Sequence, residues 1–393
     1  MSLNIIKNIF FICIINYFVL LIPNNNVPEL NDLKLISIDT LLKINPHVLY
    51  QKCHDPVSFN LKPFPIPYWE SQHPKEGTFA ETFILTIPYG NVCSEYGHVI
   101  IDQKYVLREL ILPNYRFYHS INLINENKNL ISKKIPGRVA VITRRDAGTY
   151  GHWIIDILGR IALLEIMGVD FDWIYIPYYK SFMKETLTLW GIDSNKIIEP
   201  TNDCYAIQAD ELIVPSLVSR RVPTPNKNFS SYTPLSVYYP VWAVEYIRNK
   251  FLPFIQNKIN KNFNEKIFIS RKDSCFRNIE NEDEVFKEFE NYGFVRYELS
   301  KLSFLEQLEL FHHAKVIASP NGSGLSNIMF CNKNTKILEI FQARADSSFY
   351  NLAQVVGLQY NPIFTTSFHE IGFYNTYIPI EIIKNFIEKY NFK

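Results

Sequence analysis

The sequence lacks an excess of charge of either sign, and it lacks closely spaced cysteines. Its 393 residues include 40 Lys and Arg against 39 Asp and Glu, and these side chains are scattered along the chain. Nucleic-acid-binding proteins gather positive charge on one face, so this balance argues against a nucleic-acid partner. The six cysteines form no Cys-x-x-Cys pair and have no histidine at metal-ligand spacing. We therefore expect isolated thiols, as in a cytosolic protein, without a metal site or a disulfide framework.

Long hydrophobic runs are also scarce, and the one candidate lies at residues 9–22. As a helix this run would rise roughly 21 Å, which is less than the hydrocarbon core of a bilayer. No small-residue cleavage site follows it, as a secretory signal peptide would require. We treat residues 1–34 as a hydrophobic N-terminal segment that could serve as an anchor. The expected location is cytoplasmic with membrane association through residues 9–22, and the alternatives are a single-pass signal-anchored protein and a cleaved signal peptide.

Apolar residues are plentiful, and short apolar runs alternate with helical patterns in two blocks. Hydrophobic residues make up 47% of the chain, which is typical of a folded globular protein. The first block predicts strands over 138–144, 173–177 and 211–215, with helices over 151–168 and 181–192 between them. The second predicts strands at 266–270, 294–299, 315–319 and 336–341, again separated by helical patterns. Such alternation predicts an α/β fold with parallel sheets.

A stretch rich in Pro, Ser, Asn and Tyr over 215–240 separates the two blocks and predicts a crossing between domains. We therefore expect one domain over 35–235, a second over 236–376, and a C-terminal helix over 377–393. The segment from Leu35 to Leu112 has strand-like pieces and many prolines, and it is interpreted as an extension of the first domain.

A loop rich in glycine and serine follows the strand predicted at 315–319. It reads Asn321-Gly322-Ser323-Gly324-Leu325, continues to Asn327, and leads into a predicted helix. Ligands of open parallel sheets bind outside the carboxyl ends of the strands. Glycines permit close backbone approach, and a helix start offers unpaired N–H groups to a phosphate. The motif is neither a Walker loop nor a complete dinucleotide fingerprint, and a simple turn remains the alternative.

Basic residues follow the carboxyl end of the strand at 266–270, where they could neutralise a diphosphate. Arg271 and Lys272 leave this strand directly, and Arg277 follows six residues later. A solvated loop with ordinary surface charge is the alternative. Glu306 and Gln307 begin a later helix as candidate binding residues, although Ser303 and Glu306 also fit a capping box, which needs no function.

A candidate general base lies where the first block's long helix begins. His152 and Asp156 are four residues apart, so they share one helical face, and the carboxylate could orient the imidazole. Tyr150 and Trp153 flank the histidine as candidate substrate contacts. A packing role for His152 is the alternative reading. The Asp-x-Asp at residues 170–172 superficially matches a metal-binding motif.

Taken in order, these segments resemble the bacterial type of glycosyltransferase family 61, an enzyme class of polysaccharide biosynthesis. The similar stretches are YGHWIIDILGR, ETLTLWGI, ADELIVPS, ISRK with NEDEV, LSFLEQLELFHHAKVIASPNGSGLSNIMF and TKILEIF. The resemblance implies a GT-B fold, in which two Rossmann-like domains with parallel sheets face a cleft. It further implies that the first domain binds a glycan or other hydroxyl acceptor and the second a nucleotide sugar. The implied reaction is inverting hexosyl or pentosyl transfer without a divalent metal or other cofactor.

Two departures from the family pattern affect the glycine loop. The family's loop usually begins His-Gly-Ala-Gly, whereas this chain has Asn321 for the histidine and Ser323 for the alanine. Asparagine can donate a hydrogen bond but carries no charge, so binding could persist while a protonation role could not. A non-catalytic protein that binds a nucleotide sugar or a glycan is therefore the second hypothesis. An NAD-dependent oxidoreductase ranks last because the glycine fingerprint is incomplete.

Overall fold

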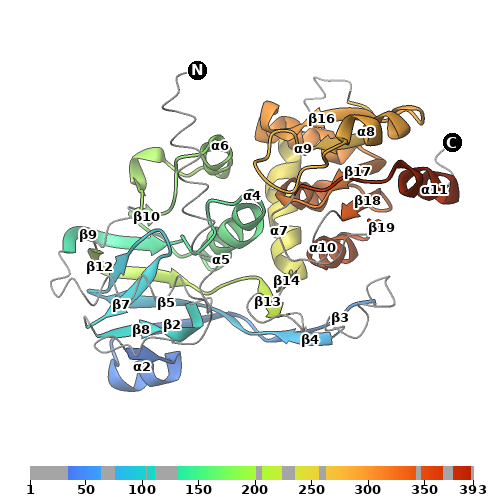
Figure 1. Ribbon diagram of the computed structural model, residues 1–393. Coiled ribbons are helices and arrows are strands. Elements are labelled where there is room, and N and C mark those ends of the chain that lie inside the picture. The colour runs from blue at the N-terminus through green and yellow to red at the C-terminus, as the bar shows by residue number, and fades with distance from the viewer. Residues whose placement is uncertain are drawn as a thin grey trace.

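The computed structural model describes residues 34–62, 76–102, 104–110, 132–200, 206–223, 235–255, 263–341, 347–365 and 375–390, which Figure 1 shows in colour. The hydrophobic run at residues 9–22 lies outside the described residues. None of the helices in the described ranges combines the length and the apolar character needed to cross a membrane.

The first half is built on a mixed sheet of ten strands. The strands are β1 (Lys34–Ile36), β2 (Leu49–His54), β5 (Thr82–Pro88), β6 (Asn91–Cys93), β7 (His98–Ile101), β8 (Tyr105–Leu107), β9 (Ser132–Val141), β10 (Trp173–Tyr175), β11 (Ile197–Ile198) and β12 (Ala206–Pro215). Strands β9 to β12 pair in parallel, as the alternation with helices predicts. Strands β5 and β6 pair antiparallel with β12, and β7 pairs antiparallel with β6.

The expectation of a wholly parallel first sheet therefore needs correction. The turn over residues 94–97 joins β6 to β7, and so short a connection allows only antiparallel neighbours. The segment interpreted as an extension of the first domain supplies β1, β2 and β5 to β8 of the same sheet.

One continuous helical stretch packs on this sheet and begins at Tyr150, close to the candidate general base of the sequence analysis. It consists of α4 (Tyr150–His152), the π-helical turn η2 (Trp153–Ile157) and α5 (Leu158–Ile166). Every residue from Trp153 to Leu164 is buried. A second helix, α6 (Ser181–Trp190), lies within the range predicted for it and is capped by Gly191, whose φ of +91° suits glycine. The short helices α2 (Ile38–Ile44), η1 (Arg108–Leu110) and η3 (Ser194–Lys196) complete this half.

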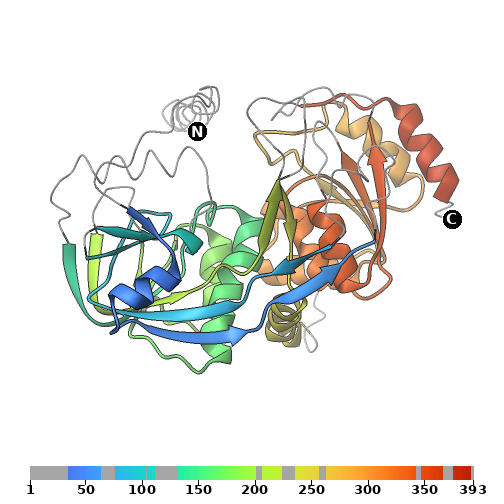
Figure 2. The same ribbon diagram turned by 90° about the horizontal axis from the view of Figure 1, so that it is seen from below.

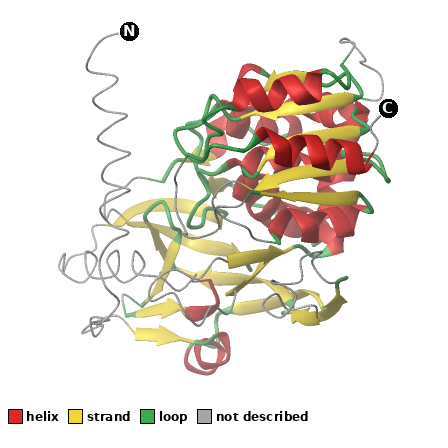
Figure 3. Cartoon of the chain, turned by 45° about the vertical axis from the view of Figure 1, so that its right-hand side comes forward, coloured by secondary structure: helices red, strands yellow, loops and turns green. Residues whose placement is uncertain are grey.

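The second half contains a wholly parallel five-stranded sheet, as predicted. Its strands are β15 (Lys266–Ser270), β16 (Val295–Glu298), β17 (Val316–Pro320), β18 (Lys336–Phe341) and β19 (Gln359–Phe364). The helices are α7 (Val241–Phe251), η4 (Leu252–Phe254), α8 (Glu282–Glu290), η5 (Leu299–Lys301), α9 (Phe304–His313), the 3₁₀ helix η6 (Ser323–Phe330), α10 (Ser348–Val356) and α11 (Ile380–Tyr390). Figure 3 shows helices on both faces of this sheet, an arrangement that buries all-parallel strands.

The order of strands in this sheet creates a switch point. The order is β16-β15-β17-β18-β19, so the chain leaves β15 toward one side and later returns to its other side. Loops diverge where such an order reverses, and ligands of open α/β sheets bind in the resulting crevice. The switch point lies between β15 and β17, whose carboxyl ends carry Arg271 and the glycine loop.

Apolar packing and an extended ribbon join the two halves. One hydrophobic cluster contains Ala140 and Ile174 from the first sheet together with Ile267 and Ile317 from the second. The antiparallel ribbon of β3 (Val57–Asn60) and β4 (Glu76–Phe79) runs from the first half beneath the second, as Figure 2 shows. A second ribbon pairs β13 (Arg220–Pro223) with β14 (Leu235–Tyr238), within the stretch predicted to cross between domains.

Candidate functional site

A cavity of about 850 Å³ opens at the switch point between the two halves. The second half lines it with the loops that follow β15 and β17 and with the start of α9. The first half contributes Gly148 to Tyr150 and the start of α6. The volume falls in the range of small-molecule sites. The cavity therefore brings together loops from both halves of the chain at the place where an α/β sheet binds ligands.

Arg271 lines this cavity with a guanidinium that its own loop holds in place. Its Nε donates to the carbonyl of Arg277 at 3.2 Å, and its Nη2 donates to Ser274 Oγ at 2.8 Å and to the carbonyl of Phe276 at 2.9 Å. Its Nη1 lies against Gly322, where an added Cβ would come within 1.7 Å of it. Burial lowers the pKa of Arg271. A desolvated cation in a fixed position is suited to bind an anion.

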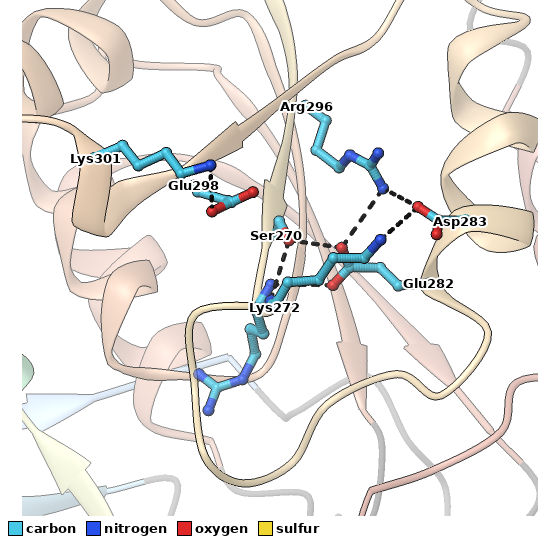
Figure 4. A network of polar contacts seen from close by, with 8 residues as sticks. Ser270, Lys272, Glu282, Asp283, Arg296, Glu298 and Lys301 are labelled. Atoms are coloured by element: carbon cyan, nitrogen blue, oxygen red, sulfur yellow. Dashed lines mark hydrogen bonds and ion pairs between the residues drawn. The ribbon is translucent and has the colours of Figure 1, made fainter. Parts of the chain in front are cut away.

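The backbone that carries Arg271 is fixed by a buried carboxylate. Glu282 accepts a hydrogen bond from Ser270 Oγ at 2.6 Å (Figure 4). It also accepts one from the Arg271 N–H at 3.0 Å. The neighbouring Lys272 does not line the cavity, because its Nζ pairs with Asp283 at 2.6 Å on an exposed surface. Of the two adjacent cations predicted to meet a diphosphate, only Arg271 therefore faces the cavity.

The glycine loop presents backbone rather than side chains to the cavity. Gly322, Ser323 and Gly324 line it at the start of η6, whose first N–H groups have no partner within the helix. An added Cβ on Gly324 would lie 2.7 Å from Leu299 Cδ1, the end of a flexible side chain that can move away. Leu325 is buried and belongs to the core.

Asn321 lies behind this loop and joins two charged residues. Its Nδ2 donates to Glu339 Oε1 at 2.6 Å, and its Oδ1 accepts from Arg277 Nη1 at 2.8 Å. The Tyr360 hydroxyl donates to the other oxygen of Glu339. Asn321 is 2% exposed, and neither it nor Arg277 lines the cavity. The structure therefore gives both residues a role in supporting the loop.

A chain of hydrogen bonds connects the two walls of the cavity. Tyr150 donates its hydroxyl proton to Asn327 Oδ1 at 2.6 Å, and Asn327 Nδ2 donates to Gln307 Oε1 at 3.0 Å. Tyr150 and Gln307 line the cavity, whereas Asn327 is fully buried. Glu306 does not line the cavity, because it forms the predicted capping box with Ser303.

His152 and Asp156 follow the Gly148 to Tyr150 wall in sequence, but neither of them lines the cavity. Asp156 Oδ2 accepts from His152 Nδ1 at 3.1 Å and pairs with Arg144 at 2.7 Å, while its Oδ1 accepts from the Ser219 hydroxyl. The Asp156 side chain is 2% exposed and that of His152 is 26% exposed, so only the histidine can meet a ligand. Trp153 is fully buried, with its indole N–H on Thr186, and makes no contact with the cavity.

Sequence reasoning missed the second cation of the cavity, Lys180. Lys180 and Arg271 are the cationic side chains among the described residues that line it. Lys180 Nζ donates to the carbonyl of Gly148 at 2.7 Å, and burial lowers its pKa. The rule that singled out Arg271 would have found it, because Lys180 follows the carboxyl end of β10. Glu185 also lines the cavity, where its carboxylate accepts from the Phe304 N–H.

The Asp-x-Asp at residues 170–172 has a structural role at a bend of the first sheet. Asp172 Oδ2 accepts from the Arg138 N–H at 2.8 Å, next to Gly137, whose φ is +87°. Within the described ranges, no three His, Cys, Asp or Glu side chains are grouped as ligands of a metal ion. The expectation of metal-independent chemistry stays a prediction.

Fold and site together define an α/β protein with a cavity at the switch point of a parallel sheet, into which charged side chains project. Residues 150–338 match the sequence model of the family Glycosyltransferase 61, a span that contains every site residue predicted from the sequence. The match covers a little under half of the chain, and it confirms the resemblance to glycosyltransferase family 61 seen in the motifs. This similarity points to glycosyltransferase activity in general. A comparison with curated proteins gives no match.

Proposed function

We propose that the protein is an inverting glycosyltransferase that moves a hexosyl or pentosyl group from a nucleotide sugar to a hydroxyl of a glycan or glycoconjugate. We assign it a GT-B-like arrangement, with acceptor binding by residues 35–235 and donor binding by residues 236–376. The observation that carries the proposal is the Arg271 guanidinium, fixed against Gly322 at the switch point and facing a cavity shared by both halves.

The proposed reaction needs stabilisation of a departing nucleoside diphosphate. The acceptor oxygen forms a bond to the anomeric carbon while the bond from that carbon to the diphosphate oxygen breaks. Negative charge grows on the diphosphate, and preorganised donors aimed at that charge lower the barrier. Arg271 and the amides of Ser323 and Gly324 supply such donors from one wall, and Lys180 supplies a positive charge from the other. No divalent metal or other cofactor enters this proposal.

The proposed general base is His152. Asp156 holds the Nδ1 side of the ring, which leaves Nε2 as the nitrogen to take the proton of the acceptor hydroxyl. Arg144 offsets the charge of Asp156 at 2.7 Å, so the carboxylate positions the imidazole and is itself too buried to meet the acceptor. The acceptor would then approach beside the wall formed by Gly148 to Tyr150.

We further propose a cytoplasmic location, with membrane association through the apolar run at residues 9–22. A glycosyltransferase held there would work at the membrane surface, where it could reach membrane-bound glycoconjugates. Single-pass signal anchoring is the alternative.

A panel of nucleotide sugars tests the proposed donor chemistry. The purified protein is incubated with each donor, and release of the free nucleotide is measured with and without glycan acceptors. We expect release from at least one donor, loss of release in Arg271→Met, and near-normal release in Lys272→Met, a matched change of the adjacent cation that faces away. Equal release by Arg271→Met and the unchanged protein would contradict the assignment.

The same panel separates the two hypotheses. His152→Gln should bind the donor normally but lose transfer, because only the proton acceptor is removed. If the unchanged protein binds a donor without any release or transfer, it is a non-catalytic nucleotide-sugar-binding protein, an outcome that Asn321 at the family's histidine position favours.

A further inference from the structure

A second cavity, of about 650 Å³, lies between the β3–β4 ribbon, helix α7 and helix α10. Six of its twenty lining residues carry aromatic rings: His54, Phe59, Phe79, Tyr238, Tyr239 and Trp242. None of its lining residues also lines the first cavity. We propose that this second cavity binds a neutral oligosaccharide, as a glycan site separate from the diphosphate site.

The aromatic walls are held in place by neighbouring groups. The His54 and Trp242 rings stack with centroids 4.3 Å apart, and His54 Nδ1 is hydrogen-bonded to Thr82 Oγ1 at 2.7 Å. The Phe59 and Tyr238 rings stack at 4.8 Å. Fixed, flat apolar surfaces match the C–H face of a pyranose ring and lose little side-chain entropy on binding.

Charge distinguishes the ligand of this cavity from that of the first. Its described lining contains no Lys or Arg but does contain two carboxylates, of Glu245 and of Asp55, the latter paired with Lys52 at 2.7 Å. A diphosphate or a uronic acid would be repelled there, whereas sugar hydroxyls would donate hydrogen bonds to the carboxylates. Aromatic faces beside hydrogen-bond acceptors, without positive charge, therefore favour a neutral saccharide over an anionic one.

The cavity is already formed, and its rim is apolar. The ribbon is tied to α10 because the Lys62 N–H donates to Gln354 Oε1 at 2.8 Å and the Tyr350 hydroxyl donates to the Lys62 carbonyl at 3.1 Å. Val57 and Val241 at the rim are 50% and 51% exposed. Exposed apolar residues around a hollow are typical of ligand-binding surfaces.

A backbone connection links this cavity to the candidate general base. Val218 lines the cavity, and the next residue, Ser219, donates its hydroxyl proton to Asp156, which positions His152. An acceptor glycan seated on the aromatic walls would thus lie against the segment that supports the base. The choice of a saccharide as ligand rests on the proposed function. The shape of the cavity, its aromatic rings and its charge are observed independently of that function.

The test measures binding of defined neutral hexasaccharides to the full chain. Maltohexaose, cellohexaose, xylohexaose and mannohexaose are compared with hexagalacturonate by calorimetry and by saturation-transfer NMR. We expect at least one neutral probe to bind, and hexagalacturonate to bind about tenfold more weakly or not at all, because a repelled carboxylate replaces one favourable polar contact. Binding of no neutral hexasaccharide, or tighter binding of the uronate, would overturn the proposal.

Two variants locate the binding. Glu245→Lys, at an exposed position that should tolerate change, should weaken binding of the neutral probe and strengthen binding of hexagalacturonate. Phe59→Leu should weaken binding of both. Glu290→Lys, an exposed charge reversal on α8, is the matched control and should leave both unchanged. If neither Glu245→Lys nor Phe59→Leu changes oligosaccharide binding, the assignment to this cavity would be overturned.

The experiment also separates this inference from the proposed function. Oligosaccharide binding that survives Arg271→Met, in a protein that never releases nucleotide, would support the glycan site and refute the transferase. Nucleotide release without any oligosaccharide binding would support the transferase and refute the glycan site.

Discussion

Replacing Gly322 by alanine should dislodge Arg271 from the cavity. The new methyl carbon would lie 1.7 Å from Arg271 Nη1 and 2.8 Å from Cζ, whereas ordinary contact begins near 3.4 Å. The guanidinium must therefore retreat by roughly 1.7 Å, about half a contact distance. Its three side-chain hydrogen bonds, now 2.8 to 3.2 Å long, cannot survive such a shift.

The expected magnitudes follow from those hydrogen bonds. Each contributes about 1 kcal/mol net and water partly replaces it, so the free energy of unfolding should fall by about 1–3 kcal/mol. Loss of one charge-assisted contact to a phosphate costs about 1.5–3 kcal/mol, or roughly 10- to 150-fold in affinity. Urea unfolding measures the first quantity, and calorimetric titration with nucleoside diphosphates measures the second.

The control is Gly324→Ala in the same loop. Its methyl group meets only the flexible end of Leu299, so we expect less than about threefold loss of affinity. Because Gly322→Ala acts through Arg271, it should have little further effect in an Arg271→Met background. Normal nucleotide affinity in Gly322→Ala, or full additivity with Arg271→Met, would refute the reasoning.

Three further predictions concern the cavity and the sheet behind it. Lys180→Met should weaken pyrophosphate binding about tenfold in calorimetry by removing one charge, whereas Lys184→Met on an exposed face of α6 should not. Tyr150→Phe leaves a buried amide oxygen without its donor, so urea unfolding should show a loss of about 1–3 kcal/mol, against no change in Tyr377→Phe. Burial lowers the pKa of His98 to about 4, below the usual 6.5. Only the unfolded chain then binds this proton, so stability should fall from pH 6.5 to 4 by roughly 3 kcal/mol, and His98→Gln should flatten that slope.

The second sheet could be predicted closely from the sequence because its signals are local. The runs at 266–270 and 336–341 are apolar and are bounded by turns, and both are strands over those same residues. The capping box at Ser303 likewise depends on residues three apart. The antiparallel part of the first sheet was missed because pairing of β5 and β6 with β12 joins segments more than a hundred residues apart.

The sequence predicts which candidate site residues follow the ends of strands, but not where their side chains point. The sequence places Arg271 and Gly322 at the carboxyl ends of two strands, and the sheet order makes those strands neighbours. The direction of each side chain depends on long-range partners, which is why Lys272 turns to Asp283 and why Asn321 is buried on Glu339. No sequence motif marks the second cavity, because its walls come from five separate segments of the chain.

A crystal structure with a bound nucleoside diphosphate would test the central claim most directly. The diphosphate is expected in the cavity between the halves, with phosphate oxygens within hydrogen-bond distance of Arg271 Nη1 and of the amides of Ser323 and Gly324, and with Lys180 Nζ facing it from the other wall. A diphosphate bound anywhere else, with Arg271 still held only by its own loop, would contradict the account.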